Sequence, residues 1–502
     1  MRRSPRRLTS DCTPREDTVI VRMAEPEAGI LLELLFQRYP HAEWATFARF
    51  GWRQAGETLV LTLAAIDAPR DGDLDPRVPH VAIDEAYTLR TALAADAHPL
   101  AIGVIHSHPS GCEPEPSSID DDMDAYYARY YADFAPGRPY VSLIASHVDD
   151  ELVMSGRIWW QGAWLGARRI IAERRPLRTW TLRAAGHIDA PLRSRTARLT
   201  AAFGEAAEHQ LRSATVAVIG AGGTGSAAIE VLARAGVGHL IIVDPDRVDD
   251  SNLERLHGST LHDAEQQTPK ARVAARHVAS IDPTCRVTAV IGALPQADIV
   301  HAVIQADVAI GCTDQQHSRL ALADLTVRYL VQSIDCGVML EGRDGAVRGQ
   351  IVQLIRSLPA DPCPYCREMI DSVRVTQELM SPEDRAARRA AAGEAQSRGE
   401  SGSPYWHDLP QLNTVGYLTT MAGAVAAGYA IGWITDRFTT PFARLQMNLV
   451  APFLDVTDAD GIPDPTCACR RSRGWADQGA ADAFITAPAH WPPPQWVSKR
   501  HR

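Results

Sequence analysis

The sequence lacks an excess of positive charge and has no internal repeats. Its 502 residues include 51 Lys and Arg against 61 Asp and Glu, so the net charge is −10 and the pI is about 5.9. Proteins that bind nucleic acids do so largely through cations that neutralise phosphates. The acidic balance therefore argues against a nucleic-acid partner.

The sequence also lacks the marks of secretion. The first seven residues are basic, but no apolar stretch follows them, so we expect no signal peptide. Nine cysteines, an odd number, then fit a reducing cytoplasm in which cysteines bind metals or pack. One run, residues 415–435, is long enough to span a membrane, but Ala, Gly and Thr dominate it and no basic cluster flanks it. We expect a buried core helix there, no membrane partner and a cytoplasmic protein.

A glycine-rich turn between two apolar segments is the most informative feature that is present. Residues 216–219 and 240–243 predict buried strands, and a helix rich in small residues is expected between them, up to about residue 235. Such a unit binds phosphates at the helix N-terminus, and an acid about 20 residues on, here Asp244, takes ribose hydroxyls. The glycines of the turn are Gly220, Gly222, Gly223 and Gly225.

Charged residues after the turn indicate a triphosphate rather than a dinucleotide. A nucleoside triphosphate with Mg²⁺ needs cations for its β and γ phosphates and a carboxylate for the metal. Arg255 and Lys270 supply the cations, and Asp314, after a predicted strand, supplies the carboxylate. Asp246 and Asn252 complete this polar set. An NAD-dependent oxidoreductase is the alternative for the glycine turn alone.

This set of residues resembles the adenylation domain of the E1-like superfamily, which includes ubiquitin-activating enzymes and the bacterial ThiF and MoeB proteins. The resemblance implies a Rossmann-like domain with a mostly parallel sheet, which adenylates the C-terminal carboxylate of a ubiquitin-like or sulfur-carrier protein with ATP and Mg²⁺. In that family an arginine before the first strand reaches the triphosphate of the partner subunit, which implies this role for Arg198 and a homodimer. The matching segments are 220–226, 243–246, 251–255, 267–270 and 312–314.

A second motif follows an apolar segment, residues 100–105, that predicts a strand. His106 and His108 are two residues apart in extended chain, so their side chains point the same way. Ser117 then has the character of a helix N-cap, with Asp120 in the first turn. Two imidazoles and one carboxylate leave a zinc ion one open position, the pattern of a catalytic site. The alternative is structural, because an acid in the first turn stabilises any helix.

The order of strand, His-x-His-Pro, loop and Pro-Ser-x-x-Asp resembles the JAMM (MPN) zinc metallopeptidases, which cleave bonds after ubiquitin-like tails. The resemblance covers residues 28–160 and implies that the two histidines and the aspartate bind a catalytic zinc. It also implies that Ser117 stabilises the oxyanion and that an upstream glutamate is the general base. We assign the base to Glu43, because it opens the first predicted strand, whereas Glu33 and Glu57 are expected on a helix face and in a hairpin.

Four cysteines form two closely spaced pairs. Cys363 and Cys366 form a CxxC pair, and Cys467 and Cys469 form a CxC pair, which together predict a structural tetrahedral zinc site. Packing of unligated cysteines is the alternative. E1-like proteins can carry a thioester cysteine between such pairs, but the segment between Cys366 and Cys467 contains no cysteine. This favours an adenylate that passes directly to another protein.

The motifs predict an α/β protein with two enzymatic domains, consistent with 45% apolar and 22% charged residues. The predicted division is a JAMM/MPN domain at 17–165, a linker at 166–192, an E1-like domain at 193–470 and a tail at 471–502. The tail, which contains Pro and Trp, could dock on a partner or on the chain's own surface.

We therefore expect a bifunctional enzyme that processes or removes the tail of a ubiquitin-like protein and adenylates its C-terminal carboxylate. The composition, rich in Ala and Arg, and the compact fusion favour a bacterial protein. Bacterial JAMM–E1 pairs resemble ubiquitin-like conjugation systems, some of them linked to phage defence, which implies an E2-like protein as a further partner. We favour conjugation because we see no rhodanese-like segment that would hand over sulfur. One alternative is the activation of a sulfur carrier. Another is a scaffold in which one domain has lost its activity.

Overall fold

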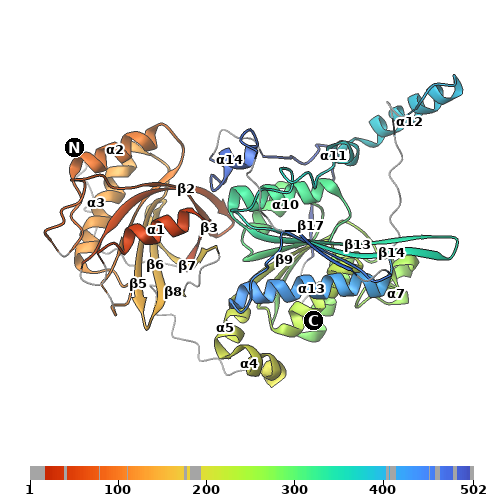
Figure 1. Ribbon diagram of the computed structural model, residues 1–502, viewed down its shortest axis with the longest axis horizontal. Coiled ribbons are helices and arrows are strands. Elements are labelled where there is room, and N and C mark those ends of the chain that lie inside the picture. The colour runs from red at the N-terminus through yellow and green to blue at the C-terminus, as the bar shows by residue number, and fades with distance from the viewer. Residues whose placement is uncertain are drawn as a thin grey trace, which may run out of the picture. The chain divides into compact units, whose positions relative to one another are not determined.

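The computed structural model describes residues 17–38, 42–78, 80–109, 111–173, 178–180, 194–402, 406, 414–450, 453–457, 464–478 and 483–497. The chain divides into two compact units, which are described separately below (Figure 1). The N-terminal unit comprises the chain up to residue 190 with residues 327–330 and 471–482, and the C-terminal unit comprises residues 191–326, 331–470 and 483–502.

A sheet that closes on itself forms the centre of the N-terminal unit. Its strands run in the order β5-β4-β2-β3-β1-β7-β6-β8, and β5 also pairs with β6, which closes the circuit. The pairings β1–β3, β1–β7, β4–β5 and β6–β8 are parallel, and the others are antiparallel. The strands are β1 (Asp17–Met23), β2 (Ala45–Ala55), β3 (Thr58–Asp67), β4 (Ala101–Ser107), β5 (Tyr140–Val148), β6 (Glu151–Trp160), β7 (Ala163–Ala172) and β8 (Arg178–Trp180).

Helices cover both faces of this sheet. Alternate side chains of β4 enter two different cores, because successive residues of a strand point to opposite faces. Ile105 belongs to a core with α1 (Glu27–Leu35), and Val104 belongs to a core with α2 (Glu85–Asp96) and α3 (Ser118–Phe134). This explains why every residue of β4 is buried. The strand that leads to His106 is thus fixed from both sides.

A nine-stranded sheet forms the centre of the C-terminal unit. Its order is β16-β15-β14-β13-β12-β9-β10-β11-β17, in which the run from β13 to β11 is parallel and the remaining pairings are antiparallel. The prediction of a mostly parallel sheet is therefore wrong, and the sheet is mixed. The strands are β9 (Thr215–Ile219), β10 (His239–Val243), β11 (Arg286–Ile291), β12 (Val308–Gly311), β13 (Gln332–Arg343), β14 (Ala346–Ser357), β15 (Arg444–Asn448), β16 (Phe453–Thr457) and β17 (Gln495–Trp496).

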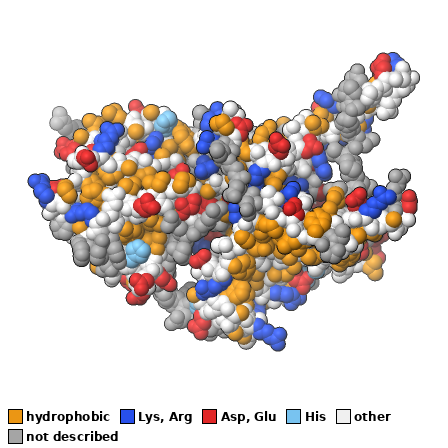
Figure 2. Space-filling model, in the orientation of Figure 1, with side chains coloured by type: hydrophobic (Ala, Val, Ile, Leu, Met, Phe, Trp, Pro, Cys, Tyr) orange, Lys and Arg blue, Asp and Glu red, His pale blue; other side chains and the backbone are white. Residues whose placement is uncertain are grey.

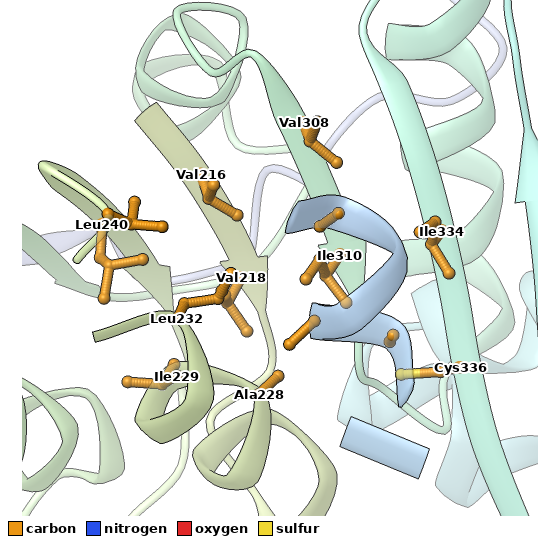
Figure 3. Packing of buried hydrophobic residues seen from close by; sticks show 14 of the residues in the cluster. Val216, Val218, Ala228, Ile229, Leu232, Leu240, Val308, Ile310, Ile334 and Cys336 are labelled. Carbon is orange, nitrogen blue, oxygen red and sulfur yellow. The ribbon is translucent and has the colours of Figure 1, made fainter. Parts of the chain in front are cut away.

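The α-helices of the chain after residue 194 mostly flank this sheet (Figure 1). Figure 3 shows buried side chains of β9, β12 and β13, such as Val218, Ile310 and Ile334, packed with those of α6. The helices are α4 (Ala197–Phe203), α5 (Glu205–Ser213), α6 (Gly223–Ala235), α7 (Leu261–Glu265), α8 (Lys270–Ile281), α9 (Ala297–Val303), α10 (Gln316–Tyr329), α11 (Ser372–Leu379), α12 (Pro382–Ser397), α13 (Gly416–Thr435) and α14 (Ala468–Ser472).

The long apolar helix α13 is a core helix, as predicted. By length and composition it could cross a membrane, but Leu418, Ala422 and Ala426 lie in the hydrophobic core of the unit. Its small residues allow close packing on α6, since a Cβ at Gly423 would lie 2.2 Å from the carbonyl oxygen of Thr224. Its outward side is also apolar: Tyr417 is 56% exposed, and hydrophobic side chains gather over this helix in Figure 2.

Two predicted segment boundaries are wrong. The predicted linker begins inside β7, where Ala167 and Ile170 point into the core of the N-terminal unit. The predicted tail is divided between the units. Gly474 accepts a hydrogen bond from Thr62 of β3 at 2.7 Å within the N-terminal unit, whereas β17 pairs with β11 in the C-terminal unit. The contacts of the tail and the pairing of β7 with β1 join residues far apart in the chain, for which the local sequence gives no signal, whereas the hairpin of β6 and β7 is local and was missed.

Candidate functional site

The turn between β9 and α6 is shaped by glycines with different roles. Gly220 has a φ of +94°, and a Cβ there would lie 2.7 Å from the carbonyl oxygen of Cys312. A Cβ at Gly225 would lie 1.8 Å from the carbonyl oxygen of Gly220, so the helix can begin this close to the turn only with glycine. Gly222 instead faces open space and precedes a helix start without a side-chain cap. The N–H groups there are available to an anion.

Asp244 lies buried at the end of β10, directly against this turn. Its carboxylate accepts hydrogen bonds from the backbone N–H groups of Ala221 at 2.6 Å and Asp246 at 2.8 Å. Burial raises the pKa of Asp244 to about 6, although the nearby Lys270 acts in the opposite direction. The predicted ribose-binding acid therefore also fixes the glycine turn to the sheet.

Two predicted cations lie close to the turn. The Cγ and Cδ atoms of Arg255 are 3.1 Å from the position of a Cβ at Gly223, so this side chain packs against the start of α6. The Lys270 Nζ is 2.9 Å from an Asp246 carboxylate oxygen. Asn252 accepts a hydrogen bond from the Asp249 N–H at 3.3 Å, in the capping box that begins the short 3₁₀ helix before Arg255. The rarity of lysine was a further signal for Lys270, because the sequence contains only one other lysine.

Asp314 lies in the turn between β12 and α10, and it is exposed. Two residues before it, the carbonyl group of Cys312 touches the position of a Cβ at Gly220, so this turn lies beside the glycine turn. The backbone carbonyl of Asp314 accepts a hydrogen bond from Arg374 at 2.9 Å. Sequence reasoning missed Arg374 and its neighbour Glu378, because α11 carries no motif that points to the turn.

Arg198 is not part of this cluster within one chain. It is exposed on α4, which packs on α5. Among the residues that the structure describes, no hydrogen bond or ion pair involves the Arg198 side chain. The predicted role of Arg198 in a partner subunit stays a prediction.

The second group of candidate residues lies in the N-terminal unit, where β4 ends and α3 begins. The Nε2 atoms of His106 and His108 are 3.0 Å and 3.6 Å from the Asp120 carboxylate oxygens, and all three residues are buried. The chain reaches His108 in register with β5, since its N–H donates to the carbonyl of Ala145 at 2.8 Å. Ser117 and Asp120 form a capping box, so the helix start fixes the carboxylate.

The electrostatics of this cluster depend on the mutual contacts of its members. Burial acts to raise the pKa of Asp120, but hydrogen bonds with His106 and His108 hold it far below its usual range. Burial acts to lower the pKa of His108, but Asp120 and then Glu43 raise it. One ligand atom from each residue lies within 4.8 Å of the others. Two imidazoles and a carboxylate at this spacing fit a zinc ion with an open position.

Glu43 and Ser117 lie beside these three residues. Glu43 precedes β2, whose residue Ala45 pairs with His106, and its carboxylate accepts a hydrogen bond from the Val81 N–H at 3.2 Å. The other two glutamates considered, Glu33 and Glu57, are exposed on α1 and in the β2–β3 turn. Ser117 is exposed, and its hydroxyl oxygen accepts a hydrogen bond from the Asp120 N–H.

The two cysteine pairs converge in the C-terminal unit. The Cys363 and Cys467 sulfurs are 3.8 Å apart, the Cys366 and Cys469 sulfurs are 3.6 Å apart, and all four lie within 4.8 Å of one another. Hydrogen bonds from the neighbouring thiols lower the pKa of Cys363 to about 5. Tetrahedral zinc with Zn–S bonds of roughly 2.3 Å requires sulfurs roughly 3.8 Å apart. The four thiols therefore fit a structural zinc ion.

The ThiF family matches residues 194–469, which is more than half of the chain. The matched region includes the glycine turn, the residues around it and the four cysteines. It does not include the cluster of His106, His108 and Asp120.

Individual relatives match over shorter stretches. The adenylyltransferase and sulfurtransferase UBA4 of Yarrowia lipolytica is 37% identical over 125 residues, or 25% of this chain and 31% of that protein. The SAMP-activating enzyme E1 of Haloferax volcanii is 33% identical over 164 residues, or 32% of this chain and 56% of that protein. The chain thus spans about a third to about a half of these relatives. The structure of E. coli MccB with ATP is 18% identical over 55% of this chain and 74% of that chain, with a TM-score of 0.41.

Proposed function

Because this chain belongs to the ThiF family, we propose that its C-terminal unit is an ATP-dependent adenylyltransferase for the C-terminal carboxylate of a ubiquitin-like or sulfur-carrier protein. The observation that carries the proposal is the convergence of Arg255, Lys270 and the Asp314 turn on the glycine turn. A triphosphate needs this combination of cations and a metal-binding carboxylate, whereas a nicotinamide dinucleotide does not.

Each residue of the C-terminal site has a defined task in this reaction. The N-terminus of α6 and the cations Arg255 and Lys270 bind the phosphates, Asp244 accepts hydrogen bonds from the ribose, and Asp314 would hold Mg²⁺. These contacts orient the α-phosphorus toward the incoming carboxylate. A carboxylate oxygen bonds to that phosphorus as the bond to pyrophosphate breaks, so the products are an acyl-adenylate and pyrophosphate. The cations stabilise the charge that develops on the leaving group.

Pyrophosphate exchange is the direct test of this activity. We expect exchange of label between pyrophosphate and ATP that depends on a ubiquitin-like protein and is lost in Asp314→Ala. Exchange that is equally fast in Asp314→Ala would contradict the assignment. Thermal unfolding with ATP·Mg²⁺ or with NAD separates the two nucleotide classes, since the ligand that binds the folded state raises the melting temperature.

For the N-terminal unit we propose a zinc metallopeptidase that acts on the same C-terminal tail. The supporting observation is the buried cluster of His106, His108 and Asp120 with Glu43 beside it. When bound there, zinc would lower the pKa of water and polarise the scissile carbonyl. Glu43 would take up and return the proton, and the Ser117 hydroxyl would donate to the developing oxyanion.

The metal content of purified protein tests the N-terminal proposal. We expect two zinc ions per chain in the wild type and one in His108→Ala, because the four cysteines retain the second. Glu43→Gln should keep both ions and lose peptidase activity on a ubiquitin-like protein with an extended tail. Equal zinc content in wild type and His108→Ala would show that the histidine cluster does not bind zinc.

A shared substrate gives a reason for the two sites to occur in one chain. Cleavage of the tail exposes a carboxylate, and adenylation activates a carboxylate. We favour a bacterial ubiquitin-like conjugation pathway, for which the product is a protein–protein adduct formed with an E2-like partner. If the protein serves a sulfur carrier, the product is a thiocarboxylate, and mass spectrometry of the tail separates the two outcomes.

We further propose that the C-terminal unit forms a homodimer in which Arg198 contributes to the site of the partner. The position of Arg198 supports this arrangement: it is exposed on α4, which contacts Arg437 after the end of α13, whereas the glycine turn contacts Thr419 at the start of α13. Mixing Arg198→Ala with Asp314→Ala tests it, because heterodimers would then contain one complete site. Recovery of pyrophosphate exchange on mixing supports the dimer, and additive loss contradicts it.

A further inference from the structure

The helix α10, which begins two residues after Asp314, takes its N-terminal cap from a distant part of the chain. The Glu378 carboxylate accepts hydrogen bonds from the backbone N–H groups of Gln316 at 3.1 Å and His317 at 2.9 Å. It also contacts the His317 Nδ1 at 2.9 Å. These N–H groups are among those that a helix cannot pair internally, and a carboxylate placed there also interacts favourably with the helix dipole.

Arg374 connects this cap to the Asp314 turn itself. Its Nε is 3.0 Å from one Glu378 oxygen, and its Nη2 donates to the backbone carbonyl of Asp314 at 2.9 Å. The two residues are one helical turn apart on α11, so they present one guanidinium and one carboxylate to the same turn. The side chains are 19% and 10% exposed, and that of His317 is 4% exposed. The Glu378 cap is therefore largely shielded from water, whereas the Arg374 bond to the Asp314 carbonyl is exposed.

The hydrogen bonds that the Glu378 carboxylate accepts determine its role. Its first oxygen accepts from Gln316 and Arg374, and its second accepts from His317. Burial acts to raise the pKa of Glu378, but these hydrogen bonds lower it overall, so the carboxylate is ionised at neutral pH. With both oxygens committed to the helix start, Glu378 holds the turn and leaves the metal to the exposed Asp314 carboxylate.

We propose that Arg374 and Glu378 are positioning residues that fix the Asp314 turn for binding of ATP·Mg²⁺. The proposal rests on the metal-binding role proposed above for Asp314. It gives α11 a function in a segment without a thioester cysteine: the helix sets the geometry of the nucleotide site. Loss of the Arg374 side chain frees the Asp314 backbone carbonyl, and loss of the Glu378 side chain frees the start of α10. In either case the Asp314 carboxylate is no longer held in one orientation.

Calorimetric binding of ATP to the full chain, in Mg²⁺-free buffer with and without added Mg²⁺, tests the proposal without a protein substrate. We expect Glu378→Gln and Arg374→Ala to weaken ATP·Mg²⁺ binding by about tenfold or more, since each removes charge-assisted hydrogen bonds. Binding of ATP without Mg²⁺ should change less than twofold. Arg374→Lys should recover part of the loss, because an ammonium can still donate to the Asp314 carbonyl.

Glu208→Gln is the matched control for the Glu378 variant. Glu208 is also a buried carboxylate paired with an arginine four residues away, at 2.7 Å from Arg212, but it lies on α5. Glu208→Gln should lower the melting temperature without changing the Mg²⁺-dependent part of ATP binding. If Glu378→Gln and Arg374→Ala lower the melting temperature but leave the Mg²⁺-dependent part of ATP binding unchanged, as Glu208→Gln should, the proposal is overturned. If Glu378→Gln does not fold, Arg374→Ala, which leaves the cap of α10 in place, decides the question.

Asp314→Ala separates a failure of this proposal from a failure of the proposed function. If Asp314→Ala binds ATP·Mg²⁺ as tightly as the wild type, Asp314 does not bind the metal, and the positioning role proposed for Arg374 and Glu378 fails with it. If Asp314→Ala loses the Mg²⁺-dependent binding but the Arg374 and Glu378 variants keep it, only the positioning role of these two residues is wrong. Parallel losses in all three variants support both.

Discussion

The two candidate sites are built from the chain in opposite ways. The two histidines and the aspartate of the N-terminal cluster lie between residues 106 and 120, on one strand end and the helix that follows. The nucleotide site draws on segments from Gly220 to Glu378, which meet only at the ends of parallel strands. Short spacing lets a local motif fix the first site. The candidate nucleotide site depends on the sheet and on helices that carry no recognisable motif, so substitutions at more positions can disrupt it.

The largest expected effect is that of Gly225→Ala on the nucleotide site. A Cβ there would lie 1.8 Å from the Gly220 carbonyl oxygen, so the turn must move. We expect ATP affinity to fall by about a hundredfold or more, since a backbone shift disrupts all the phosphate contacts together. Zinc content at the histidine cluster should not change. Gly222→Ala is the control, because its Cβ meets no protein atom and the apo protein should be as stable as the wild type.

The next effect concerns a long-range support of the N-terminal cluster. Arg157 of β6 pairs with Asp124 at 2.6 Å and with Asp121, and so holds α3, which carries Asp120. Asp124 is fully buried, and Asp124→Ala leaves a guanidinium that is only 4% exposed. We expect a loss of about 3–5 kcal/mol in the free energy of unfolding, measured by urea titration. Asp75→Ala, which removes an exposed pair with Arg77, should cause no measurable change.

A smaller effect is expected from pH at the nucleotide site. Burial raises the pKa of Asp244 to about 6, above that of an aspartate in the unfolded chain. This carboxyl therefore favours the folded apo protein at low pH, and that contribution is lost as the pH rises through about 6. Ribose binding has the opposite sign, since it uses the ionised form. We expect ATP affinity to fall severalfold from pH 7 to pH 5, and less so in Asp244→Asn.

The smallest expected effect distinguishes the glutamates of the N-terminal unit. Glu33→Gln and Glu57→Gln should leave peptidase activity within about twofold of the wild type, since both side chains are exposed, on α1 and in the β2–β3 turn. Glu43→Gln should abolish it. Activity that survives in Glu43→Gln and is lost in either of the others would move the general base to a different residue.

The sequence predicted the local elements of both sites well. The strand before the glycine turn, the helix after it and the N-cap at Ser117 all occur at the expected residues, because hydrophobic periodicity and cap chemistry act over a few positions. β1 and β7 were missed or assigned to a linker, although both are buried. Their pairing with each other joins residues near 20 to residues near 170, which no local pattern encodes.

What the sequence determined by itself is therefore the chemistry: two imidazoles and a carboxylate at short spacing, four thiols in two pairs, and a glycine turn followed by cations. Only the tertiary structure decided which groups support that chemistry. Glu378 caps the helix that follows Asp314, Arg374 donates to the Asp314 carbonyl, and the segment after Cys469 is divided between the two units. The physical reason is that ligand types and caps are local properties of the chain. Pairing and packing between distant residues are properties of the complete fold.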